Sequence, residues 1–123
     1  MKPVLFLLGI LFMLSSNAQE TYEIVEKQPE FPGGLAAMQE YLATNIIYPI
    51  EAIESGIQGV VYIKFLVTKS GEIEQLKIVR GVDDLLDNEA KRVILLMPKW
   101  VPGEQAGGKV NVWLTVPVRF KLY

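Results

Sequence analysis

The C-terminal end of the chain alternates between apolar residues and residues of other kinds. From Val110 to Leu122 every even position is apolar, while the odd positions read Asn, Trp, Thr, Pro, Arg and Lys. This period of two predicts a strand with one buried face. Pro117 has no N–H to donate to a neighbouring strand, so we expect this strand at an edge of its sheet.

The first half of the chain shows helical spacing. Apolar side chains recur at Leu35, Met38, Tyr41 and Leu42, which predicts a helix over residues 35–44. The pair Tyr48-Pro49 is typical of the start of a second, short helix, because proline is tolerated in the first turn. Gly56 favours the left-handed backbone that ends such a helix.

The middle of the chain predicts a β-hairpin followed by a helix. Residues 59–68 are rich in β-branched and aromatic residues, residues 69–71 read Lys-Ser-Gly, and the charged segment 72–80 follows as the hairpin partner. Asp84 is expected to cap the next helix, over residues 85–97. That helix has one apolar stripe, made of Leu86, Ala90, Val93, Ile94 and Met97.

This order of elements predicts an α+β domain: two N-terminal helices, a β-hairpin, a helix and a final edge strand. The segment 60–67 is apolar on both faces except for Lys64, as expected of a central strand. If the last strand lies beside it, every neighbouring pair is antiparallel. The expected sheet is therefore three-stranded, with spatial order 2-1-3.

The N-terminus has the form of a secretory signal peptide. Lys2 precedes an apolar run from Val4 to Leu14, and small residues follow at Ser16 and Ala18. We expect a signal peptide at 1–18, an extended polar lead at 19–28 and a domain at 29–123. The alternative is an uncleaved signal that anchors the chain in the inner membrane.

Composition narrows the chemistry. Histidine and cysteine are absent, which removes the usual zinc, thiolate and histidine-based catalytic sites. The net charge is −2 without a basic run, so no nucleic-acid partner is expected. Gly103 to Lys109 is one residue short of a phosphate-binding loop and precedes a strand instead of a helix. The acids at 83, 84, 87 and 89 suit a helix start. We expect no enzyme, no cofactor and no metal site.

Four motifs in order resemble the C-terminal domain of TonB. They are Tyr48-Pro49-x-x-Ala52-x-x-x-Gly56-x-x-Gly59-x-Val61, Leu86-Asp87-x-Glu89-Ala90-x-Arg92, Met97-Pro98-Lys99-Trp100-x-Pro102-Gly103 and Val116-Pro117-Val118-x-Phe120. Phe31-Pro32-Gly33-Gly34 is similar to a version of this domain found in envelope proteins with several TonB-like paralogues. The resemblance covers about residues 29–123.

The resemblance implies a small domain in the periplasm of a Gram-negative cell that takes part in transport across the envelope. Such a domain binds an extended segment, the TonB box, of an outer-membrane receptor, which adds as a strand beside the last strand. TonB itself transmits energy from an ExbB–ExbD motor through a membrane anchor and a long spacer. We see neither in this sequence, so any link to such a motor is expected to be indirect.

The alternation of the last strand suggests which backbone groups meet a partner. Successive residues of a strand direct their N–H and C=O groups to opposite sides, and Pro117 should face the open side because it has no N–H. The odd residues before it would then pair with an incoming strand. The expected partner-binding residues are Val110, Asn111, Val112, Trp113, Leu114, Thr115 and Pro117. The alternative is a structural or assembly module that forms a homodimer through the same edge.

Overall fold

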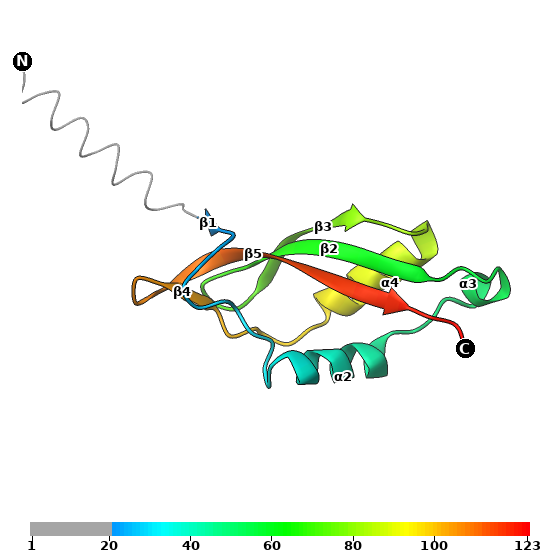
Figure 1. Ribbon diagram of the computed structural model, residues 1–123, viewed down its shortest axis with the longest axis horizontal. Helices are drawn as coiled ribbons and strands as arrows, with labels where there is room; N and C mark the ends of the chain where they lie inside the picture. The colour runs from blue at the N-terminus through cyan, green and yellow to red at the C-terminus, as the bar shows by residue number, and fades with distance from the viewer. Residues whose placement is uncertain (1–20) are drawn as a thin grey trace, which may run out of the picture.

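The computed structural model describes residues 21–123 (Figure 1). The predicted signal peptide at 1–18 lies outside the described residues. The elements, in chain order, are β1 (Thr21–Tyr22), α2 (Leu35–Asn45), α3 (Ile50–Glu54), β2 (Gly59–Val67), β3 (Ile73–Arg80), α4 (Asp84–Leu95), β4 (Gly103–Gln105) and β5 (Gly108–Phe120). Within the described part, no helix is both long and apolar enough to cross a membrane.

The centre of the sheet has the predicted topology. β2 pairs antiparallel with β3 on one side and with β5 on the other. The β2–β5 ladder is the longer one and runs from the pair Gly59–Phe120 to the pair Val67–Val112. The α+β class and the relative order of these three strands are therefore confirmed.

Two short strands extend the sheet beyond the prediction of three. β1 pairs in parallel with β5, on the side of β5 away from β2, and β4 pairs antiparallel with the start of β5. The prediction of a three-stranded sheet was wrong in this respect. The added strands have two and three residues of mostly polar character, too few to show a period of two.

The core lies between the sheet and the helices. Val61, Ile63, Phe65 and Val67 of β2 are fully buried on one face of the sheet. The predicted stripe of α4 is fully buried at Leu86, Ala90, Val93 and Ile94, whereas Met97 lies after the end of the helix and is half-buried. Trp100 packs edge-on against Phe65, with 5.6 Å between ring centroids. Its indole N–H is itself buried and has no hydrogen-bond partner among the described residues, so Trp100 belongs to the core.

The helices begin and end close to the predicted residues. Gly56 has the expected positive φ of 67° after α3. The predicted cap of α4 was wrong by one residue: the carboxylate of Asp83 accepts a hydrogen bond from the Leu85 N–H, and Asp84 is already helical. The sequence does not distinguish these two adjacent aspartates, because aspartate is a good N-cap at either position.

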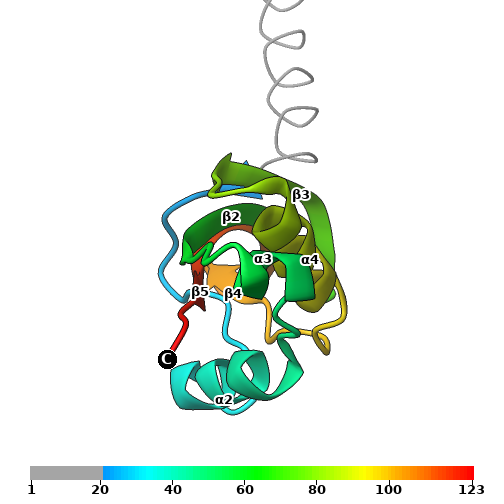
Figure 2. The same cartoon turned by 90° about the vertical axis from the view of Figure 1, so that its right-hand side faces the viewer.

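The helices do not form one layer. In the end-on view of Figure 2, α3 and α4 lie together beside the sheet, whereas α2 lies apart from them, below β5. Figure 1 also shows α2 running beneath the C-terminal part of β5. This position places α2 next to β5, the strand on which the sequence analysis placed the partner-binding residues.

Candidate functional site: the outer edge of the last strand

The two faces of β5 differ as the alternation predicts. The even residues Val112, Val116, Val118 and Phe120 are buried, and Val110 and Leu114 are half-buried. On the odd positions, Thr115, Pro117 and Arg119 are exposed. The even residues therefore build the core, and the strand presents its odd side chains on the other face.

The first half of β5 is covered by the chain itself. Gly103 of β4 pairs with Val110, and Thr21 and Tyr22 of β1 pair with Asn111 and Val112. We call the side of β5 away from β2 its outer edge. Three of the seven predicted binding residues, Val110, Asn111 and Val112, thus already have neighbours in this structure.

The second half of β5 has a different environment. From Trp113 to Phe120 it pairs with β2 on one side, and no described strand pairs with its outer edge. We call this stretch the open half. The other predicted binding residues, Trp113, Leu114, Thr115 and Pro117, lie in the open half or at its start.

Contacts of the N-terminal lead hold β1 in place. The Lys64 ammonium lies 5.2 Å from the centroid of the Trp113 ring and 2.9 Å from a carboxylate oxygen of Glu23. Lys64 lowers the pKa of Glu23 through this hydrogen bond and through its charge. The Trp113 side chain, predicted to stand beside a docking edge, is half-buried opposite Leu66.

A second set of contacts ties the lead to the β4–β5 hairpin. The backbone of Lys27 exchanges two hydrogen bonds with Glu104, and their side chains form an ion pair at 3.6 Å. The Ala106 N–H donates to the Glu26 carboxylate at 2.8 Å. The glycine-rich segment before β5 is therefore a tight hairpin turn and not a phosphate-binding loop. Ala106 and Gly107 in this turn have positive φ.

A groove separates α2 from the open half of β5. It has a volume of about 370 Å³ and is lined by Leu35, Met38, Gln39, Leu42, Ala43, Ile46, Pro117 and Arg119. We call it the α2 groove. A smaller hollow of about 220 Å³ adjoins it at the start of α2 and shares Leu35 and Met38 as lining residues. This groove was not predicted from the sequence, because its two walls are far apart along the chain.

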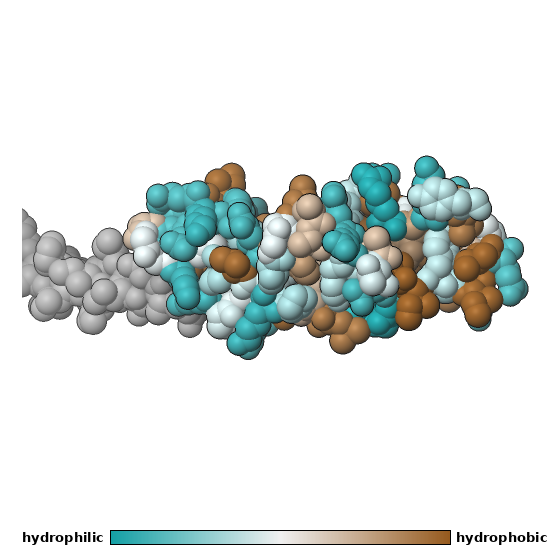
Figure 3. All heavy atoms as spheres, turned by 90° about the horizontal axis from the view of Figure 1, so that it is seen from below, coloured by the Kyte–Doolittle hydropathy of each residue, from teal (hydrophilic) through white to brown (hydrophobic). Residues whose placement is uncertain are grey.

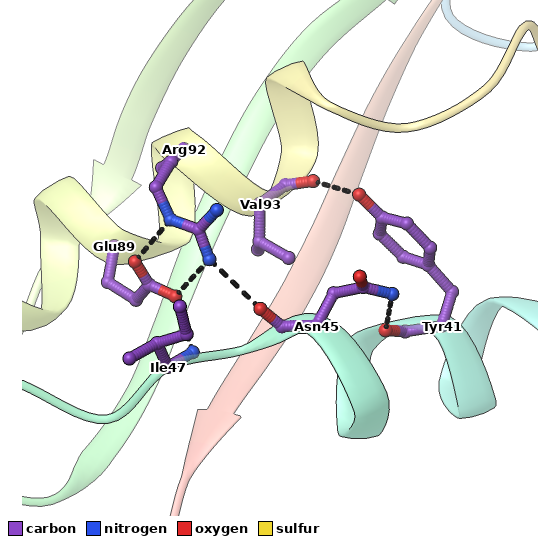
Figure 4. A network of polar contacts seen from close by, with 6 residues as sticks. All are labelled: Tyr41, Asn45, Ile47, Glu89, Arg92 and Val93. Atoms are coloured by element: carbon purple, nitrogen blue, oxygen red, sulfur yellow. Dashed lines mark hydrogen bonds and ion pairs between the residues drawn. The ribbon is translucent and has the colours of Figure 1, made fainter.

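Hydrogen bonds to α4 fix α2 and the segment after it (Figure 4). The Tyr41 hydroxyl donates to the Val93 carbonyl oxygen at 2.8 Å. The Arg92 guanidinium donates to the Asn45 carbonyl oxygen at 2.9 Å and to the Glu89 carboxylate at 2.7 and 2.8 Å. Glu89 also accepts from the Ile47 N–H at 2.6 Å.

This network changes the pKa values of its members. Burial acts to raise the pKa of Glu89, but hydrogen bonds from Arg92 and from the Ile47 N–H outweigh it and lower the pKa overall. Burial raises the pKa of Tyr41. Glu89 is therefore charged at neutral pH, and its hydrogen bonds hold α2, which forms one wall of the α2 groove, against α4. This role is structural. Within residues 21–123, no group of three or more Asp or Glu side chains is placed to hold a metal ion.

Comparisons with known proteins address this fold directly. The sequence profile of the family described as Gram-negative bacterial TonB protein C-terminal matches residues 44–122, more than half of the chain. The chain belongs to this TonB C-terminal family. The match includes α3, the central strands, α4 and all but the last residue of the chain's C-terminal part.

Two solved structures have a similar fold. An NMR solution structure of the TonB C-terminal domain of Helicobacter pylori is 25% identical, with a TM-score of 0.55, over 70% of this chain and 78% of that chain. A shorter piece of the same domain has 24% identity and a TM-score of 0.50, over 70% of this chain and 90% of that chain. A comparison with curated proteins gives no match. The TonB-like fold and a role connected with TonB-dependent transport follow.

Proposed function

We propose that this chain is a periplasmic binding module that captures an extended segment of an outer-membrane TonB-dependent receptor by β-strand addition. The observation that carries the proposal is the open half of β5. A strand of 13 residues continues well past β1, and among the described residues its outer edge has no partner strand there. Unpaired N–H and C=O groups in a row are a template for an added strand.

The register of Pro117 supports the direction of this pairing. Pro117 lies opposite Tyr62 in the ladder between β5 and β2. If its nitrogen faced Tyr62, the ladder would lack a donor at this position. The odd residues of β5 should therefore direct their backbone groups to the outer edge, and Thr115 then offers both an N–H and a C=O to a partner.

The proposal includes secretion by the signal peptide expected at 1–18 and a binding role without catalysis, with an indirect link, if any, to an ExbB–ExbD-type motor. The domain would hold the receptor segment rather than pull it alone. The alternative is that a second copy of the chain pairs with the open half and forms a homodimer through the same edge.

The substitution Thr115→Pro tests strand addition, because it removes one outward N–H while leaving the β2 ladder intact. The matched control is Thr115→Val, which keeps the N–H and the β-branched shape. We would titrate labelled peptides from the N-terminal segments of TonB-dependent receptors of the same cell and measure fluorescence anisotropy. Loss of one hydrogen bond of about 0.5–1.5 kcal/mol predicts roughly two- to tenfold weaker binding for Thr115→Pro alone.

Equal affinities for the two variants, with both folded by circular dichroism, would refute strand addition at this edge. Sedimentation equilibrium of the unmodified domain tests the homodimer alternative. A stable dimer that dissociates in Thr115→Pro, together with no peptide binding, would assign the edge to self-assembly.

A further inference from the structure

The α2 groove continues the open half of β5 sideways. Pro117 and Arg119 belong to both, and the opposite wall is one side of α2. Figures 1 and 2 both place α2 beneath this part of β5. A strand added to the outer edge would therefore lie between β5 and α2.

The length of the groove suits a short extended segment. Its lining begins at Leu35, the first residue of α2, and ends at Ile46, just after the helix, which is about 16 Å at 1.5 Å per residue. The same distance corresponds to about five residues of a β-strand at about 3.3 Å each. The groove is thus long enough for about five residues of an added strand, and on β5 it meets the open half at Pro117 and Arg119.

The wall on α2 is mainly apolar. Leu35, at the start of the helix, is 66% exposed, and Met38 and Leu42 form the buried floor. Figure 3 shows the molecule from the side of α2, where hydrophobic side chains are exposed among hydrophilic ones. Covering such surface stabilises a complex by roughly 25 cal/mol for each Å² of apolar surface removed from water.

The wall on β5 has one unmatched charge. Arg119 is exposed and makes no ion pair or side-chain hydrogen bond with any described residue. Beside it, Pro117 offers a carbonyl oxygen but no N–H to an added strand. Backbone pairing is therefore weakest next to Arg119, and side-chain contacts have most to contribute there.

We infer that the α2 groove selects the partner segment: it receives the apolar side chains of an added strand, and Arg119 pairs with a carboxylate of that strand. The inference rests on the proposed function, because it requires a strand at the outer edge. The preferred ligand is an extended peptide with apolar residues and an acidic residue near its contact with Arg119. A purely backbone-driven edge would not distinguish such a peptide from other sequences.

The test uses the strongest binder from the panel of receptor peptides. Ala43→Trp places a large side chain in the groove at an exposed position, and Thr44→Trp places the same side chain next to it, outside the groove lining. We expect Ala43→Trp to weaken binding by about tenfold. Thr44→Trp should stay within about twofold, as is usual for surface substitutions.

A charge exchange tests the role of Arg119. Arg119→Glu should weaken binding of the acidic peptide by about two- to fivefold, the range of an exposed ion pair. Replacing the acidic residue of the peptide with lysine should restore binding to Arg119→Glu and weaken binding to the unmodified chain. The preference should also decrease as salt is added.

The outcomes separate the two proposals. Peptide binding that Thr115→Pro weakens, but Ala43→Trp and Arg119→Glu leave unchanged, would overturn the groove and retain strand addition. No binding of any peptide would overturn both. A dimer of the unmodified chain that Ala43→Trp dissociates would show that a second copy occupies the groove, and would also overturn the inference.

Discussion

The two halves of β5 have the same alternating sequence but different neighbours. Residues 108–112 are paired with β4 and β1, whereas the outer edge from Trp113 onward meets no described strand. In the covered half, Gly103 packs against Val112, and the ion pairs Lys27–Glu104 and Lys64–Glu23 hold the N-terminal lead. In the open half, Pro117 and Arg119 line the α2 groove. The difference shows that strand pattern alone does not determine which edge is available, because β1, which covers the outer edge at Asn111 and Val112, comes from the opposite end of the described chain.

The largest expected effect breaks the covered half. A Cβ on the buried Gly103 would lie 2.7 Å from Cγ2 of Val112 and 3.0 Å from the carbonyl oxygen of Lys27. Gly103→Ala should therefore reduce the free energy of unfolding by about 1–3 kcal/mol through overpacking. Gly108→Ala is the matched control, because its nearest neighbour would be 3.9 Å away. Urea denaturation measures the stability of both variants. Equal midpoints would contradict the prediction and show that the lead and the hairpin shift to accommodate the added Cβ at no cost.

The next effect loosens the wall beside the open half. Glu89→Gln removes the charge that Arg92 and the Ile47 N–H stabilise, and should lower the free energy of unfolding at pH 7 by about 1–3 kcal/mol. Because the folded-state pKa of Glu89 is lowered, its contribution is complete above the unfolded pKa of about 4.3 and is lost as pH falls through the folded value.

Denaturation from pH 7 to pH 3 checks this prediction. The difference between Glu89→Gln and the unmodified chain should be constant above about pH 5 and should shrink below about pH 4. Glu40→Gln, at an exposed position of α2, serves as the control. A difference that is independent of pH would mean that the carboxylate charge does not hold α2.

A smaller effect makes the two halves alike. If Asn111 and Thr115 both direct their N–H groups outward, amide exchange should be slower at Asn111, which β1 covers. A chain that begins at Ile24 lacks β1, and exchange at Asn111 should then approach that at Thr115. Binding of a receptor peptide should become a few-fold tighter, because β1 no longer competes for the outer edge with a pairing energy of about 1 kcal/mol. Glu23→Gln, which keeps β1, controls for the lost charge; unchanged exchange at Asn111 would contradict the role of β1.

The smallest effect strengthens the covered half. Ala106 has a φ of 50° in the two-residue turn between β4 and β5, where Asn-Gly is the favoured pair. Ala106→Asn should raise the free energy of unfolding by about 0.5–1 kcal/mol. Gln39→Asn, at an exposed position in the middle of α2, should lower it by a few tenths of a kcal/mol because asparagine is a poorer helix former. Thermal unfolding that moves in the same direction for both would refute the turn assignment.

The sequence predicted those parts of the fold that repeat a local period. The alternation of β5, the spacing of Met38 and Leu42, and the stripe of α4 each extend over several residues, so the buried faces were correctly assigned. β1 and β4 were missed because two or three polar residues show no period, and their pairing depends on partners 90 and 7 positions away, as in Thr21 with Asn111 and Gly103 with Val110.

The candidate site was predicted only in part for the same reason. The unusual proline identified the outer edge of β5, but no local feature indicated that β1 covers Asn111 and Val112. The contacts of Arg92 with Glu89 and with the Asn45 carbonyl oxygen were also missed. The ion pair could have been predicted, because an acid and an arginine three residues apart lie on the same face of a helix. Its link to α2 is a long-range contact that no pattern within α4 can show.

The position of β5 in the sheet has a consequence for how the domain folds. The last strand in the sequence lies between β1, the first, and β2, so both of its main pairings join distant parts of the chain. A protein synthesised from its N-terminus cannot complete this sheet until β5 has left the ribosome. Such distant pairings slow folding, which leaves the newly made chain in an unfolded form for longer. Loss of even a few C-terminal residues would remove core side chains such as Phe120 and prevent closure.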